Sequence, residues 1–377
     1  MTSELEHAEE LGEHIAHEEG RHALLAPVEL IEDEFTHKTK ARRIAESVLS
    51  VSVVLIMFAF IIPRLFDAEY RDVFEKFSQL DGRAVLALFV AWFGSMWTYW
   101  SFMTRTLPGL RTAQAGVLNL SGSAVANVVP FGGAVGVGAT YGQCMSWGFA
   151  PPQVTVSILV SGVWNVFSKL AFPAVALVCV ALRGKNLRQL DLAALVGLTV
   201  LVAAISVFWL IVRSEHAASV IDASFERIWN GTRRLYGREP NRRSRHAVVE
   251  FRRKIVGLVR QHWMALTIWM VAYKVSSFVL QLLCVRALGI TELGWVEVLA
   301  AYTFGELLTT IPLTPSGVGF VEAGSAGIMV AFGTPNEAAL AAVFLFRGFT
   351  YLFEIPAGGL AWLIWATRRS WRREINS

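Results

Sequence analysis

Residues 305–324 read GELLTTIPLTPSGVGFVEAG, an apolar segment interrupted near its centre by Pro312, Pro315 and a Gly-Val-Gly. Proline removes a backbone donor and glycine tolerates unusual dihedral angles, so one straight helix cannot continue through this stretch. The apolar arm on each side has about 16 residues, or roughly 24 Å as helix, which is short for crossing a bilayer. We therefore expect a broken helical hairpin at membrane depth.

A second segment of the same kind lies earlier in the chain. Residues 118–142 read LNLSGSAVANVVPFGGAVGVGATYG, with Pro130 before a small-residue turn that ends in Gly136-Val-Gly138. Each broken segment is followed by an apolar span with an interior cation and then a proline, which are Lys169 and Pro173 in the first case and Arg347 and Pro356 in the second. Close packing by small residues would explain either segment alone, whereas the matched pair favours an internal repeat.

The composition around these segments is that of a membrane protein. Hydrophobic residues make up 54% of the chain and charged residues 17%, against about 25% charged in soluble domains. A helix needs about 20 apolar residues to cross the hydrocarbon. Runs of that length cover 45–65, 84–103, 153–181, 190–212, 262–288 and 337–366, and the broken stretches extend over 112–150 and 296–335. The sequence predicts an all-α integral membrane protein, a polytopic helical bundle with two broken, re-entrant hairpins.

Basic loops predict the orientation, because positive charge tends to stay on the cytoplasmic side. Lys38, Lys40, Arg42 and Arg43 precede the first span, and twelve Lys or Arg lie between Arg213 and residue 261. Both termini are therefore expected in the cytoplasm, with 112–150 entering and leaving from inside and 296–335 from outside, as an inverted repeat. In this arrangement Arg183, Lys185 and Arg188 lie on the external side, against the rule for positive charge. The 214–261 connection carries far more positive charge, so its side decides the orientation.

The predicted organisation is an acidic cytoplasmic tail over 1–44, a transmembrane domain over 45–367 that contains the basic connection 214–261, and a basic cytoplasmic tail over 368–377. The acidic tail contains His14, His17 and His22. These histidines fit either a metal site or a solvated surface, and the acidic surroundings favour the solvated surface. We expect no metal site.

The run Pro312-Leu-Thr-Pro315-Ser316-Gly317-Val-Gly319-Phe-Val-Glu322 resembles the Pro-x-x-Pro-Gly-Gly-x-Gly-x-x-Glu signature of the flippase-like transmembrane family named for the membrane part of lysylphosphatidylglycerol synthetase. The resemblance covers about 45–367. The first broken segment, with Asn127 and Pro130, also fits the layout of that family. Ser316 replaces a usual Gly, and Ala134-Val135 stands where many members place a charged residue. The resemblance implies a protein of the cytoplasmic (inner) membrane that binds and translocates an anionic lipid or lipid-linked headgroup, without the aminoacyl transferase domain.

Interior ionisable residues are the candidate site, because a charge at the bilayer centre costs about 2.5–3.5 kcal/mol even on insertion scales. Arg347, Lys169 and Lys274 are candidates for binding a lipid phosphate. Helix N-termini near Gly317, Gly319, Gly136 and Gly138 would add backbone donors. Glu322, Glu306 and Glu354 are candidates for ion pairs or proton coupling, and Glu322 is a candidate either to pair with Arg347 or to take up a proton. Mutual neutralisation of the six charges is the structural alternative. Pro130, Pro312 and Pro315 are expected to break helices.

Other function classes have less support. The chain has no HExxH, nucleophile elbow or phosphate loop, so we expect neither an enzyme nor a cofactor. Cys144, Cys179 and Cys284 lack CxxC spacing and are expected to pack in the membrane. The expected partner is a membrane lipid and not nucleic acid, and a homodimer or a membrane enzyme partner stays open. Two alternative functions also stay open: a non-transporting partner of a glycosyltransferase or lipid synthase, and an ion-coupled transporter of a small solute.

Overall fold

A computed structural model describes residues 61–66, 70–128, 132–182, 205–210, 247–310 and 314–368, and the single residues 52, 56, 199, 202, 213 and 371. These ranges are helical and contain no strand. The acidic tail with its histidines, the segment 214–246, most of the predicted spans 45–65 and 190–212, and most of the C-terminal tail lie outside the described residues.

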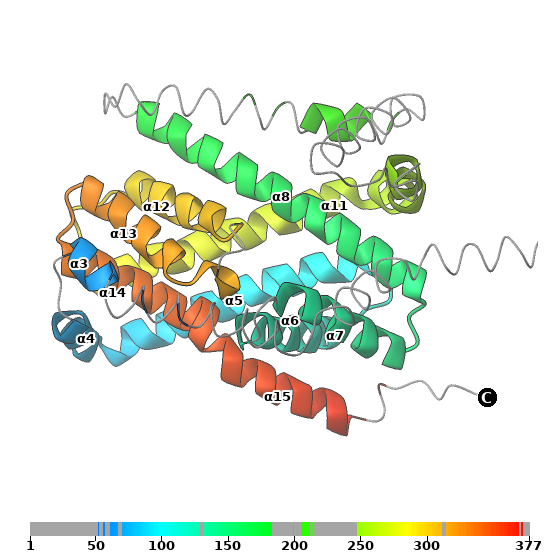
Figure 1. Cartoon of the computed structure of the whole chain (residues 1–377), viewed down its shortest axis with the longest axis horizontal. Helices are drawn as coiled ribbons and strands as arrows, with labels where there is room; N and C mark the ends of the chain where they lie inside the picture. Colours follow the sequence, from blue (N-terminus) through cyan, green and yellow to red (C-terminus); the bar gives the residue numbers. More distant parts are fainter. Residues whose placement is uncertain are drawn as a thin grey trace, which may run out of the picture.

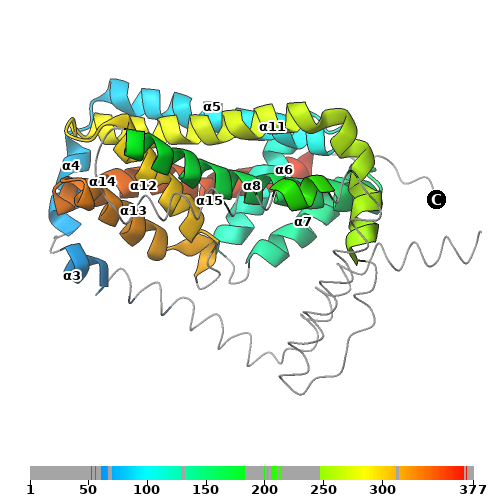
Figure 2. The same ribbon diagram turned by 90° about the horizontal axis from the view of Figure 1, so that it is seen from above.

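The helices follow one another in a bundle (Figure 1). In chain order they are α3 (Ile62–Phe66), α4 (Tyr70–Ser78), α5 (Gly82–Thr106), α6 (Thr112–Val128), α7 (Gly132–Ser146), α8 (Pro151–Leu182), α11 (Ala247–Ala287), α12 (Trp295–Leu308), the 3₁₀-helix η3 (Pro315–Gly317), α13 (Phe320–Ala331), α14 (Asn336–Arg347), the π-helix η4 (Gly348–Leu352) and α15 (Glu354–Thr367). Figure 2 shows α5 and α11 running side by side, and these two helices are in contact.

Four helical segments in the described part of the chain are long and apolar enough to cross a membrane: Gly82–Thr106, Pro151–Leu182, Ile255–Ala287 and Asn336–Thr367. The shortest has 25 residues, or roughly 37 Å at 1.5 Å per residue, which exceeds the hydrocarbon thickness. Large apolar side chains such as Leu86, Val90 and Leu360 are exposed on these segments, as expected where a helix faces lipid. The protein is an all-α membrane protein, and four of the predicted spans coincide with these segments.

Each of the two broken stretches is a pair of short helices in contact, α6 with α7 and α12 with α13. The prolines Pro130 and Pro312 fall in the gaps 129–131 and 311–313, outside the described residues, whereas Pro315 begins η3. The second break contains the left-handed residues Ser316, Gly317 and Gly319, with φ of 50°, 70° and 90°. The structure therefore has helix breaks in the stretches where they were predicted, while re-entry into the membrane and the inverted repeat stay predictions.

The first break ends earlier than its glycines suggest. Helix α7 already begins at Gly132, so Gly136 and Gly138 lie inside the helix and not in the turn. An added Cβ on Gly136 would lie 3.4 Å from the carbonyl oxygen of Gly122 on α6. This distance is that of an ordinary van der Waals contact between α6 and α7, and the backbone N–H groups of Gly136 and Gly138 are not at a free helix end.

Candidate functional site: a charged cavity within the bundle

A cavity of about 140 Å³ lies among α6, α11, α12, α13 and the α14–α15 segment. Its walls include the carboxylates Glu306 and Glu354, the guanidinium of Arg347, and hydroxyl groups such as those of Ser123, Ser325 and Thr309. The other three predicted ionisable residues each contact a residue of this wall. The fold therefore brings all six interior charges to one place.

The first group of contacts joins three helices. Lys274 of α11, buried at 4% exposure, donates a hydrogen bond to Oε2 of Glu306 on α12 and forms an ion pair with it. Lys169 Nζ on α8 donates to Thr309 Oγ1 at 2.7 Å. Lys169 is close enough to Glu306 for that charge to act on it, but it forms no ion pair with any carboxylate that the structure describes.

The second group contains the Arg347–Glu322 ion pair. Arg347 Nε donates to Glu322 Oε1 at 2.7 Å, and Arg347 Nη2 donates to the Ser316 carbonyl oxygen at 3.3 Å. The guanidinium carbon also lies 4.8 Å from the Tyr351 ring centroid, a cation–π contact. Five N–H donors are available on an arginine, so Arg347 keeps donors for a ligand while its position is held from three sides.

Glu322 occupies the anion position at the N-terminus of α13. Its Oε2 accepts the backbone N–H of Gly319 at 2.6 Å, and the Gly317 N–H is bonded to the Thr314 carbonyl at 3.1 Å. A helix N-terminus attracts an anion, and here the chain supplies its own carboxylate. The donors predicted at Gly317 and Gly319 are thus already used.

Asn127 connects the two broken stretches. Ser316 Oγ donates to Asn127 Oδ1 at 2.7 Å, Asn127 Nδ2 donates to the Tyr351 carbonyl at 3.3 Å, and the Tyr351 hydroxyl donates to the Asn127 carbonyl at 2.8 Å. The serine that departs from the family signature therefore supplies a bond that glycine could not. These contacts hold the end of α6 against η3 and η4.

Several buried polar groups on the cavity wall have no strong partner among the described residues, including Glu354, Gln281 and the Tyr302 hydroxyl. Glu354 is 7% exposed and is in no ion pair with a described cation. Gln281 is 1% exposed, and its Nε2 has no hydrogen-bond partner in the described part of the protein. Buried polar atoms normally form hydrogen bonds to protein, water or ligand. The cavity wall therefore has hydrogen-bond donors and acceptors available for a ligand.

Sequence reasoning missed the uncharged polar residues of the wall. Tyr273, Ser277 and Gln281 lie on α11 at intervals of four and therefore share one helix face. Tyr302 faces them from α12. The spacing of four within an apolar span was a usable signal, whereas the position of Tyr302 follows only from how α11 and α12 pack.

An all-α bundle with several membrane-crossing helices around a buried, charged cavity is a polytopic integral membrane protein. The family model for the lysylphosphatidylglycerol synthase TM region matches residues 46–358, and the chain belongs to that family. A comparison with curated proteins gives no match. The family links the protein to membrane lipids, and none of the described residues form a group of three His, Cys, Asp or Glu suited to a metal ion.

Proposed function

We propose that the cavity binds the anionic headgroup of a membrane lipid and that the protein carries this headgroup between the leaflets, as a carrier and not as an enzyme. The main support for this proposal is the environment of Lys169. This residue has a half-buried ammonium group whose hydrogen-bond partner is a threonine hydroxyl, beside an already neutralised Lys274–Glu306 pair. An ammonium has three donors, so Lys169 can donate to a phosphate without breaking an existing ion pair.

The size of the cavity favours a headgroup over a whole lipid. At about 140 Å³ it is smaller than the roughly 300–1,000 Å³ typical of small-molecule pockets. A phosphate-sized group would fit, while the acyl chains would stay in the surrounding membrane. Lys169 lies behind the wall residue Thr309. Arg347 and Gln281, which line the cavity, would supply further donors.

Broken helices in two halves of a membrane protein are typical of transport sites. The bonds of Asn127 to Ser316 and Tyr351 join the first broken stretch to the second. In our proposal these bonds open when access changes from one side of the membrane to the other.

The test is leaflet exchange of labelled anionic phospholipids in proteoliposomes. We expect exchange by the wild type and at least tenfold slower exchange by Lys169→Gln, because a hydrogen bond to a charged group contributes about 1.5–3 kcal/mol. Lys169→Arg keeps the charge and should retain most of the rate. Arg105→Gln, an exposed cation at the end of α5, is the matched control.

Equal rates for Lys169→Gln and the wild type would contradict the proposed site. A correctly folded wild type that exchanges none of the anionic lipids would contradict translocation and would favour the non-transporting partner role.

A further inference from the structure

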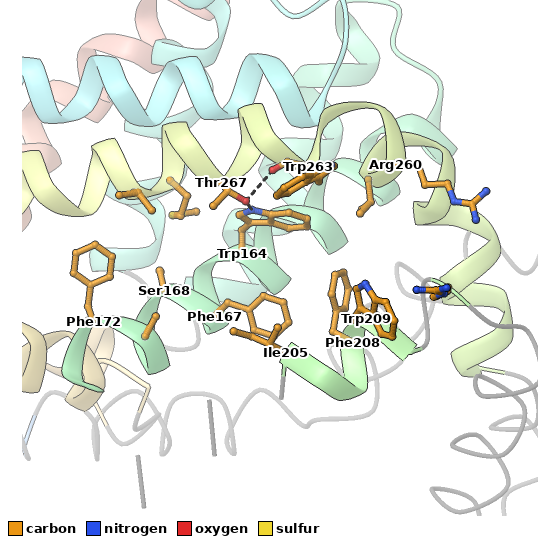
Figure 3. Close-up of a pocket in the computed structure, with 15 residues that line it drawn as sticks. Trp164, Phe167, Ser168, Phe172, Ile205, Phe208, Trp209, Arg260, Trp263 and Thr267 are labelled. Atoms are coloured by element: carbon orange, nitrogen blue, oxygen red, sulfur yellow. Dashed lines mark hydrogen bonds between the residues drawn. The ribbon is translucent and has the colours of Figure 1, made fainter. Parts of the chain in front are cut away.

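A second, larger hollow lies on the outer side of α8, between α8, α11 and the helical residues 205–210 (Figure 3). Its volume is about 710 Å³, within the range of roughly 300–1,000 Å³ for ligand pockets. Lining residues such as Trp209 and Trp263 are about half exposed, so the hollow opens on the surface of the bundle. We call it the outer groove.

Aromatic side chains form ordered walls along the outer groove. Phe208 packs edge-on against Trp164 and Phe167 of α8, with ring centroids 6.0 Å and 5.1 Å apart. Trp164 Nε1 donates to Thr267 Oγ1 on α11 at 3.1 Å, which connects the two long helices. The groove is therefore held open by contacts between its own walls.

The charge of the outer groove is concentrated at one end. In Figure 3 Arg260 lies at one end and Phe172 at the other. Arg213 also lines the groove, and its guanidinium carbon lies 4.7 Å from the Trp209 ring centroid. Neither arginine is in an ion pair with a carboxylate of the described chain.

This polarity matches that of a phospholipid in a membrane. Tryptophan is enriched at the interface between headgroups and hydrocarbon, and Trp209 and Trp263 lie close to the arginines in the sequence. Basic pockets between membrane helices bind anionic headgroups, and arginine can bind phosphate through two parallel hydrogen bonds. Beyond the arginines the walls are mostly apolar, and Ser168 and Thr267 are the other polar residues that line the groove.

We propose that the outer groove is a binding site for an anionic glycerophospholipid, with one acyl chain between the aromatic walls and the phosphate at Arg213 and Arg260. Unselective lipid around a membrane protein needs neither an aromatic-walled groove nor two arginines at one end that lack a carboxylate partner among the described residues. The site is separate from the charged cavity and does not depend on whether the protein translocates lipid. Because Ser168 lines the groove and Lys169 contacts Thr309, helix α8 contacts both places.

The test measures binding of phosphatidylglycerol and phosphatidylcholine to the delipidated protein by native mass spectrometry. We expect the wild type to bind at least one phosphatidylglycerol at least tenfold more tightly than phosphatidylcholine. Arg213→Gln with Arg260→Gln should reduce the number of tightly bound phosphatidylglycerol molecules by one, whatever the charged cavity retains. Ala171→Phe, which places a ring inside the groove, should weaken phosphatidylglycerol binding by about tenfold.

Matched controls use the same substitutions elsewhere. Arg105→Gln with Arg253→Gln removes two exposed cations that do not line the groove, and Val175→Phe adds a ring at an exposed position of α8. Both controls should bind phosphatidylglycerol like the wild type.

Equal binding of the two lipids, or unchanged binding in the double arginine variant or in Ala171→Phe, would overturn the proposal. Loss of the bound lipid in Lys169→Gln together with its retention in the groove variants would also overturn it, because the lipid would then lie in the charged cavity.

Discussion

Glu322 shows at the scale of one residue how a charge is accommodated inside the helical bundle. Its side chain is 4% exposed, and its two oxygens accept from Arg347 Nε and from the Gly319 N–H. Burial in low dielectric disfavours any isolated charge. Glu322 is stabilised because a cation and a helix N-terminus meet it together.

Removing one partner of this pair should destabilise the protein more than removing both. Arg347→Met leaves the Glu322 carboxylate buried without its cation, which costs about 3–5 kcal/mol when one member of a buried pair is lost. In the double variant Arg347→Met with Glu322→Gln, a neutral amide replaces the carboxylate and part of that loss should be recovered. The measurement is the unfolding midpoint in detergent for the wild type, both single variants and the double variant. An Arg347→Met midpoint equal to that of the wild type would show that the pair does not stabilise the fold.

At the scale of helices, the contact between α6 and α15 depends on a single glycine. A Cβ added to Gly358 would overlap the backbone carbonyl of Leu120 and the Cβ of Ala124, whereas a Cβ on the adjacent Gly359 would meet nothing within 4 Å. Small residues allow membrane helices to approach closely. Because Gly358 has no side chain, α15 can pack directly against α6 of the first broken stretch.

This contact gives a prediction with a control one residue away. Gly358→Ala should destabilise the protein by about 1–3 kcal/mol, because the two helices must separate to fit the methyl group. Gly359→Ala should leave stability unchanged or raise it by up to about 1 kcal/mol, since alanine has the higher helix propensity. Unfolding midpoints of the two variants in detergent make the comparison. An equal loss of stability in the two variants would mean that the α6–α15 contact tolerates a side chain at Gly358.

The last predicted span, 337–366, also has an internal break that periodicity did not predict. Helix α14 passes into the π-helix η4 directly after Arg347, and Phe353 N–H donates to the Gly348 carbonyl at 2.8 Å. A π-turn changes the register of the residues that follow it. Arg347 and Glu354, which flank η4, both line the charged cavity.

For the whole molecule, the orientation predicted from basic loops places residue 79 outside and Arg105 in the cytoplasm. Helix α5 begins at Gly82, just after residue 79, and has Arg105 in its last turn. Its 25 residues span roughly 37 Å. In a Cys179→Ser background, Gln79→Cys should react with a membrane-impermeant maleimide added to intact cells. Arg105→Cys should react only after permeabilisation. Cys144 and Cys284 are buried and should add little background. The opposite labelling pattern would reverse the proposed orientation of both termini.

The amino-acid sequence by itself determined the class of protein. Apolar runs long enough to cross the hydrocarbon are a local property, so the four spans in the described residues were predicted close to their observed limits. The break around Pro315 and Gly317 was predicted for the same reason, because proline and glycine act on their own backbone. The six interior charges were also found from the sequence, since an ionisable residue in an apolar span is conspicuous.

Only the tertiary structure decided which groups meet. The partners of Lys169 and Asn127 lie 140 and 189 residues away in Thr309 and Ser316, and no local pattern encodes such distances. A local signal was also misleading at Gly136, which lies inside α7 and not in the predicted turn. The outer groove likewise forms only because residues 205–210 pack against α8, far from α11 in the sequence. Composition and periodicity are local properties of the chain, so they predict helices. Ion pairs and cavities depend on how helices distant in the sequence pack, so only the tertiary structure determined the candidate site.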